Sequence, residues 1–207
     1  MQHKVIGNLK KLLDKPLPGK KVQFTMAPDD RSNLDEQKIE EKNPAIAAVM
    51  LLLFQESNQW KIPLILRATY NGVHSNQISF PGGRVEPQDK SLQNTALRET
   101  EEEIGIEPHG IKLLGGLSTL YIPPSNFMVY PFVGYIEKKI EFKKQVKEVK
   151  EIIRHPIADL LDESKKMTIN DNYPAYKVGE LNLWGATAMI MAEFLYLWRK
   201  LPNILDL

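Results

Sequence analysis

The stretch FPGGRVEPQDKSLQNTALRETEEEIGI (residues 80–106) decides how the rest of the sequence is interpreted. It places Glu99, Glu101, Glu102 and Glu103 within five residues, although like charges at helical spacing repel one another. Successive residues of a helix lie about 100° apart, so Glu99, Glu102 and Glu103 share one face, whereas Glu101 points away from them into solvent. Three carboxylates on one face indicate a bound cation.

A helix over residues 91–104 is predicted from its boundary signals. Ser91 or Asp89 is a suitable N-cap, and Gly105 has the position at which helices end in a left-handed residue. Hard divalent ions such as Mg²⁺ prefer oxygen ligands and keep waters and phosphates in their shell. The competing interpretation is a solvated polar face, which is common for a run of glutamates. The preceding Gly-Gly turn favours a site, because it lets backbone approach a ligand closely.

Together these residues resemble the Nudix box, a loop–helix–loop motif whose glutamates bind Mg²⁺ or Mn²⁺ in enzymes that cleave nucleoside diphosphates linked to another moiety. The matching positions are Gly82-Gly83, Arg98-Glu99, Glu102-Glu103 and Gly105. One departure concerns Asp89, which stands six residues after Gly83 and nine before Arg98. The family pattern has a glutamate at this place, eight residues before the arginine, so one residue is inserted and Asp replaces Glu.

The wider sequence is similar to the coenzyme A diphosphatase branch of that family. The segment LILRATYNGVHSNQISFPGG (residues 64–83) matches the branch signature at Arg67, Ala68 and the FPGG turn. The second arginine of the signature falls on Gly72 and its glycine on Asn76. Later segments, YIPPSNFMVYPFVGYI, EVKEIIRHPIADLL and LWGATAMI, follow in the order of the branch, so the resemblance covers about residues 45–197.

The resemblance implies roles for the acidic residues. Glu99, Glu102, Glu103 and the backbone carbonyl of Gly82 would ligate Mg²⁺ or Mn²⁺, and Arg98 would hold Glu99 in place. Glu148, in the segment KEVKE, is the candidate for an extra ligand or the general base. Its alternative interpretation, which applies equally to Glu151, is an exposed lysine and glutamate run.

The candidate substrate-binding residues surround the Gly-Gly turn. Arg67 ends a strand directed towards this turn, where a guanidinium would grip a phosphate or form a structural salt bridge. Arg84 and Gly83 belong to the turn itself. His74 would partly replace the arginine that is missing at Gly72, or is a bystander in a loop.

Alternating apolar patterns and turn residues predict a Nudix-type α/β/α sandwich around a mixed β-sheet. Strands are expected at residues 45–54, 62–70 and 77–80, in two segments between residues 110 and 137, and in a pair between residues 166 and 178. Helices are expected at residues 2–14, after Pro156 and over residues 185–200. We assign residues 44–207 to the catalytic domain and residues 1–43 to a helical and irregular extension.

Composition excludes several classes of protein. The 27 basic and 26 acidic residues nearly cancel, which gives no reason to expect nucleic acid or membrane as a partner. The chain has no cysteine, so a disulfide framework and a thiolate metal site are excluded. The longest apolar run, residues 45–54, is too short to cross a bilayer. We expect a soluble, cytoplasmic protein whose partner is a small molecule, and a homodimer is compatible with the sequence.

Three functions are consistent with these residues. The first is Mg²⁺-dependent hydrolysis of coenzyme A or its derivatives to 3′,5′-ADP and 4′-phosphopantetheine, or its acyl form. The second is a Nudix diphosphatase for ADP-ribose, a dinucleotide or an oxidised nucleotide, which Gly72 and Asn76 keep open. The third is a non-catalytic module that binds a nucleotide metabolite, against which the complete set of metal-binding residues argues.

Overall fold

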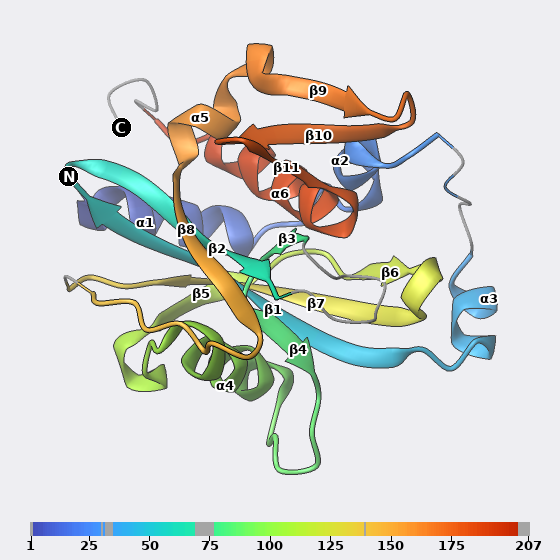
Figure 1. Cartoon of the computed structure of the whole chain (residues 1–207), viewed down its shortest axis with the longest axis horizontal. Helices are drawn as coiled ribbons and strands as arrows, with labels where there is room; N and C mark the ends of the chain where they lie inside the picture. The colour runs from blue at the N-terminus through green and yellow to red at the C-terminus, as the bar shows by residue number, and fades with distance from the viewer. Residues whose placement is uncertain (1, 30, 32–34, 69–76, 139, 203–207) are drawn as a thin grey trace.

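The computed structural model describes residues 2–29, 31, 35–68, 77–138 and 140–202 (Figure 1). Its α-helices are α1 Gln2–Leu13, α2 Lys20–Gln23, α3 Glu36–Glu41, α4 Leu92–Ile104, α5 Ile157–Leu161 and α6 Gly185–Trp198. Its strands are β1 Ala45–Glu56, β2 Gln59–Arg67, β3 Ile78–Ser79, β4 Gly82–Arg84, β5 Lys112–Gly116, β6 Leu120–Ile122, β7 Phe127–Tyr135, β8 Val149–Pro156, β9 Lys166–Ile169, β10 Tyr173–Val178 and β11 Leu181–Trp184. Short 3₁₀ turns lie at Phe24–Met26, Pro108–Gly110, Pro123–Ser125 and Glu163–Lys165.

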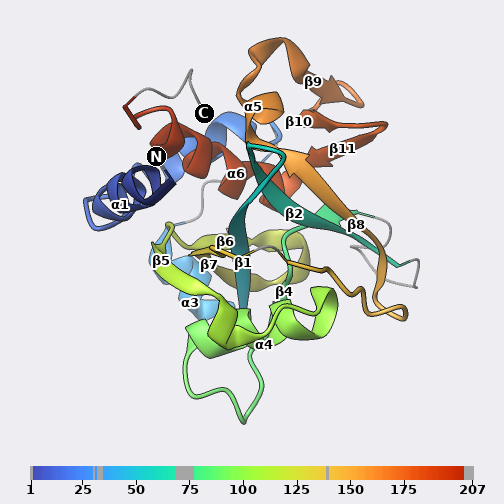
Figure 2. The same cartoon turned by 90° about the vertical axis from the view of Figure 1, so that its left-hand side faces the viewer.

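The main sheet has eight strands and is mixed, as predicted. Its central order is β3-β2-β1-β7-β5, with β4 paired to β1, β6 to β7 and β8 to β2. β1 and β7 run parallel, whereas the other pairs in this sheet are antiparallel. A second, antiparallel sheet has the order β11-β10-β9. Helix α4 covers one face of the main sheet, and α1 and α6 cover the other, which gives the α/β/α sandwich (Figures 1 and 2).

Strand β1 is apolar from Ala45 to Phe54 because both faces of this part of the strand are covered. Ala48, Met50 and Leu52 pack on the side of α4, in a cluster that includes Ala96 and Ile104. The alternate residues Ala47, Leu51 and Leu53 belong to the larger core beneath α1 and α6. Side chains alternate between the two faces of a strand, so one continuous apolar run supplies both cores.

The N-terminal region joins the larger core through α1, whose side chains Val5, Leu9 and Leu13 are buried there. A second link is Glu193 of α6, which is completely buried. Its Oε1 accepts hydrogen bonds from the Gly19 N–H at 2.9 Å and the Ser118 hydroxyl at 2.6 Å. Its Oε2 accepts from Gln23 Nε2 at 2.9 Å and the Ser118 N–H at 3.0 Å. This carboxylate therefore ties residues 19–23 to the end of the main sheet.

The predicted boundaries of the carboxylate helix are confirmed. Ser91 is the N-cap of α4 and accepts a hydrogen bond from the Asn94 N–H at 3.2 Å. Gly105 ends the helix in the left-handed conformation, with φ of 72°. Three strands, β4, β8 and β11, were not predicted from the sequence, and β4 includes the two glycines that were expected to form a turn. The charged segment at residues 147–151 is thus partly strand, because the first residues of β8 pair with the end of β2.

Candidate active site

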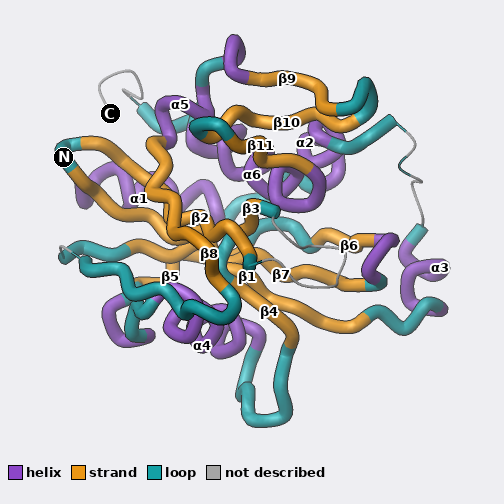
Figure 3. The backbone as a smooth tube through the Cα atoms, viewed as in Figure 1, coloured by secondary structure: helices purple, strands orange, loops and turns teal. Residues whose placement is uncertain are grey.

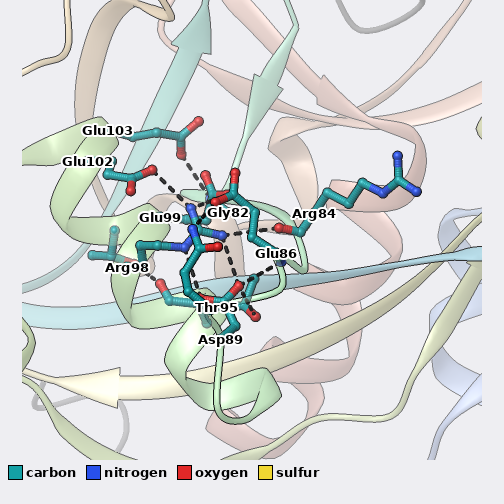
Figure 4. Close-up of polar contacts among 12 residues, drawn as sticks. Gly82, Arg84, Glu86, Asp89, Thr95, Arg98, Glu99, Glu102 and Glu103 are labelled. Carbon is teal, nitrogen blue, oxygen red and sulfur yellow. Dashed lines mark hydrogen bonds and ion pairs between the residues drawn. The ribbon is translucent and has the colours of Figure 1, made fainter.

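Arg98 lies at the centre of a group of carboxylates (Figure 4). Its Nη1 donates to Glu99 Oε1 at 2.9 Å and to Glu102 Oε2 at 3.0 Å. Its Nε and Nη2 donate to the two carboxylate oxygens of Asp89 at 3.0 and 3.1 Å. Nη2 also donates to the backbone carbonyl of Arg84 at 3.1 Å, so Arg98 links the loop after the Gly-Gly turn to helix α4. One cation faces three carboxylates, which leaves the group negatively charged.

Asp89 anchors this arrangement, a role that the sequence pattern did not indicate directly. Besides Arg98, it accepts hydrogen bonds from the Glu86 N–H and the Thr95 hydroxyl, both at 2.9 Å. The hydrogen bonds from Arg98, reinforced by those from Glu86 and Thr95, lower the pKa of Asp89 to about 2. The available signal was its position six residues after Gly83, where the family pattern also has an acidic residue.

Glu103 is the buried member of the acidic group, with a side chain that is 1% exposed. Its Oε2 accepts a hydrogen bond from the Gly82 N–H at 2.8 Å, and its Oε1 lies 3.6 Å from Arg67 Nη1. Burial raises the pKa of Glu103 to about 8, despite the opposing effects of Arg67 and Gly82. The charges of Glu99 and Glu148 raise it further. The folded protein thus holds this carboxyl where its charged form is disfavoured.

The two glycines of the turn are required by close contacts. A Cβ on Gly83 would lie 2.5 Å from Glu99 Cδ, so any larger residue would displace that carboxylate. Gly82 has φ of 153°, and a Cβ there would lie 2.5 Å from the Ala48 carbonyl oxygen. Glu99 itself is half-buried, and burial raises its pKa. The turn and Glu99 therefore fit together closely.

The loop from β7 to β8 runs past helix α4 (Figure 3), and Glu148 lies near its end. The Lys143 and Gln145 N–H groups donate to carbonyls at the end of α4, Ile104 at 2.9 Å and Glu103 at 3.1 Å. Glu148 follows in an exposed turn, and its charge acts on both Glu99 and Glu103, raising the pKa of each. Its carboxylate is thus available to solvent beside two carboxylates that are shielded from it.

Of the candidate substrate-binding arginines, one lies against the acidic group and the other points away from it. Arg67 is 25% exposed and directed at Glu103. Arg84 is exposed, and its guanidinium extends away from the carboxylates (Figure 4). His74, like Gly72 and Asn76, lies outside the described residues. Arg67 is therefore the described cation that lies against the buried carboxylate.

Within the described ranges, no group of three or more histidine, aspartate or glutamate side chains is arranged to hold a metal ion. Glu99 and Glu102 instead share Arg98, and Glu103 faces Gly82. The chemistry of the donors nevertheless fits a hard divalent cation, because every side-chain ligand offered is a carboxylate oxygen. Glu99 and Glu103 are both desolvated, a cost that a bound cation would offset.

Among the described residues, no helix has both the length and the apolar character needed to cross a membrane.

Comparisons with known proteins relate the chain to one family. The family model for the NUDIX domain matches residues 44–177. An uncharacterized Nudix hydrolase, NudL, of Yersinia enterocolitica is 33% identical over 136 residues, which cover 62% of this chain and 69% of that protein. NudL of Yersinia pestis (strain Pestoides F) is 34% identical over 135 residues, which cover 62% of this chain and 67% of that protein.

Solved structures show the same fold. A MutT/nudix family protein from Enterococcus faecalis aligns with a TM-score of 0.55 at 15% identity, over 93% of this chain and 80% of that chain. The MutT protein from Methanosarcina mazei Go1 aligns with a TM-score of 0.52 at 20% identity, over 77% of this chain and 96% of that chain. Nudix hydrolases cleave diphosphate bonds in nucleoside diphosphate derivatives and generally use divalent metal ions. Because the family model spans well over half of the sequence, the chain belongs to the Nudix hydrolase family.

Proposed function

We propose that the protein hydrolyses the diphosphate bond of coenzyme A or its derivatives with Mg²⁺ or Mn²⁺, giving 3′,5′-ADP and 4′-phosphopantetheine or its acyl form. The choice of coenzyme A rests on the motifs that resemble that branch in order over residues 45–197. We assign catalysis to residues 44–207. Residues 1–43 form an extension that contributes α1 to the core.

The observation that carries the proposal is the environment of Glu103. The carboxyl of Glu103 is buried, close to the charges of Glu99 and Glu148, and held by the backbone N–H of Gly82. A carboxyl in these surroundings is poorly suited to stabilising the protein by itself. Such a site is suited to a cation, and Glu99, Glu102, Glu103 and the Gly82 carbonyl would hold it. Glu102 is exposed, so it is free to exchange Arg98 for another partner.

The chain's own residues bind and orient the substrate. Arg67 lies within reach of both solvent and Glu103, so its guanidinium is placed to hold a phosphate of the diphosphate. Arg98 is a positioning residue, which fixes Glu99 relative to the Gly-Gly turn. A bound divalent ion supplies positive charge to the diphosphate and lowers the pKa of a water molecule. Glu148, exposed beside the site, is the candidate to accept a proton from that water.

A second candidate function is hydrolysis of ADP-ribose, a dinucleotide or an oxidised nucleotide. It is favoured by Gly72 and Asn76, which stand where the coenzyme A signature has arginine and glycine. Coenzyme A carries a 3′-phosphate that requires a cation, and Gly72 removes one obvious source of it.

A substrate panel tests the proposal. Coenzyme A, acetyl-coenzyme A, ADP-ribose, NADH and 8-oxo-dGTP are incubated with Mg²⁺ or Mn²⁺, and products are identified by mass spectrometry. Glu103→Gln removes the buried carboxylate, and Glu101→Gln, exposed on the same helix, is the matched control. We expect 4′-phosphopantetheine from coenzyme A with the wild type and the control but not with Glu103→Gln. Preferred turnover of ADP-ribose, NADH or 8-oxo-dGTP would replace the first function with the second.

A further inference from the structure

A cavity of about 450 Å³ lies between the end of the β2–β3 pair and the three-stranded sheet. Leu66, Gln77 and Ile78 line it on the side of the main sheet. Tyr173, Asn182 and Trp184 line it on the other side. Its volume falls within the range of small-molecule sites, which extends from roughly 300 to 1,000 Å³.

The register of the small sheet explains why these side chains share a face. Trp184 pairs with Ala175, and Asn182 pairs with Lys177 across the β10–β11 ladder. Residues two apart on a strand point to the same face, so Asn182 and Trp184 lie together. The opposite face carries Tyr176, Val178 and Leu183, which are buried in the core together with residues of α6. The face with Trp184 is therefore the one left for a ligand.

The chemistry of this face is that of a site for a planar ring with an amine. The rings of Tyr173 and Trp184 meet edge to face, with centroids 5.2 Å apart and planes at 71°. The Oδ1 atom of Asn182 is buried and has no hydrogen-bond partner within the described part of the chain. A buried acceptor without a donor is costly, so a ligand that donates there gains affinity. Glu180 also lines the cavity, which disfavours a phosphate in it.

We infer that this cavity binds the adenine ring of the substrate, with Trp184 against the ring and Asn182 Oδ1 accepting from its exocyclic amine. Aromatic side chains stack on bases, and asparagine pairs with the amine edge of adenine. The inference rests on the proposed function and adds to it the group that is recognised beside the diphosphate. It favours substrates that contain adenine over 8-oxo-dGTP.

The cavity lies next to the proposed diphosphate site along the chain. Leu66, which lines the cavity, directly precedes Arg67, which faces Glu103. Neighbouring residues of a strand point to opposite faces, so the two sites lie on either side of the end of β2. A substrate that occupies both must bend around this strand end, with its base on one side and its diphosphate on the other.

Tryptophan fluorescence offers a direct measurement of binding without metal or turnover. The chain has three tryptophans, and Trp60 and Trp198 are buried, at 3% and 1% exposure. Stacking of a base should therefore quench Trp184 alone. AMP is titrated into the full chain in EDTA, with ribose 5-phosphate as the probe that lacks a base. We expect quenching by AMP that is absent with ribose 5-phosphate and lost in Trp184→Phe.

Asn182 is tested by comparing AMP with IMP, which carries an oxygen in place of the exocyclic amine. We expect the wild type to bind AMP about 3- to 10-fold more tightly than IMP, the difference that one buried hydrogen bond supplies. Asn182→Leu should remove this preference. Gln59→Leu, the same kind of change at an exposed position at the other end of β2, should keep it.

The results separate this inference from the proposed function. Loss of the AMP preference in Asn182→Leu supports the adenine site even if coenzyme A is not hydrolysed. Equal binding of AMP and IMP by the wild type, or quenching that persists in Trp184→Phe, overturns it even if coenzyme A is hydrolysed. Absence of any AMP binding by the wild type at millimolar concentration also overturns it. Should Asn182→Leu fail to fold, the AMP and IMP titrations of the wild type and the Trp184→Phe titration decide.

Discussion

Replacing Glu103 with glutamine should make the stability of the metal-free protein less sensitive to pH. Burial raises the pKa of this carboxyl from 4.5 to about 8 in the folded protein. Below pH 4.5 the group is protonated in both the folded and the unfolded chain, so its contribution to stability is fully present. As pH rises towards 8, the unfolded chain ionises first and the contribution is lost. Glutamine cannot ionise and removes this dependence.

The size of the effect follows from the pKa shift. Each pH unit between the two pKa values costs about 1.4 kcal/mol of unfolding free energy. Between pH 5 and pH 7.5 the wild type should therefore lose about 3 kcal/mol more than Glu103→Gln. The assay is urea unfolding in EDTA at a series of pH values, followed by circular dichroism. Glu101→Gln, exposed on the same helix, should follow the wild type.

Mg²⁺ should offset about half of the stability that the wild type loses relative to Glu103→Gln between pH 5 and pH 7.5. If Glu103 helps to hold Mg²⁺, the ion stabilises the wild type by about 1.4 kcal/mol at ten times its dissociation constant, and stabilises the glutamine variant much less. Parallel pH profiles for wild type and Glu103→Gln would refute the reasoning about burial. Equal stabilisation by Mg²⁺ would refute the role of this carboxylate in binding the ion.

Three further substitutions test the contacts around the site and the core. Gly83→Ala should lower kcat for coenzyme A by roughly 100-fold because its Cβ displaces Glu99; a steady-state rate within twofold of wild type would contradict this. Asp89→Ala should lower the unfolding free energy by roughly 2–3 kcal/mol at pH 7, since it removes the paired hydrogen bonds from Arg98. The urea midpoint of this variant should differ less from that of the wild type near pH 2, where Asp89 becomes protonated. Glu193→Ala should cost roughly 3–5 kcal/mol because it removes the acceptor of four hydrogen bonds, one buried and three partly buried, and an unchanged thermal midpoint would show that these contacts are not needed.

Local signals made the carboxylate helix predictable. Ser91 and Gly105 mark its two ends by residue type alone, and the 100° spacing assigns its faces. Strand β8 was missed because its exposed residues are charged and its pairing with β2 is an antiparallel contact between distant segments. No pattern near Glu193 indicates its partners, which lie 75 to 174 residues away in the sequence.

The electrostatics of the site were the least predictable feature. The sequence shows that three carboxylates share a face, but it does not show how deeply each is buried. Glu102 and Glu103 are adjacent, yet the side chain of the first is 54% exposed and that of the second 1%. This difference arises because Glu103 points beneath the Gly-Gly turn, towards Gly82, whereas Glu102 points outwards to Arg98. The tertiary contacts of the turn therefore set the pKa of each carboxyl.

The altered spacing of the motif is explained by the position of Asp89. The inserted residue moves this acidic side chain one position further from Arg98 in sequence, and aspartate is shorter than glutamate. Asp89 still reaches both Nε and Nη2 of Arg98, because the Glu86 N–H and the Thr95 hydroxyl hold its carboxylate on the side facing the helix. In this chain a carboxylate is thus fixed against one edge of this guanidinium despite the altered spacing. Its remaining Nη1 is then directed at Glu99 and Glu102, so the anchor outside the helix determines where the carboxylates on the helix lie.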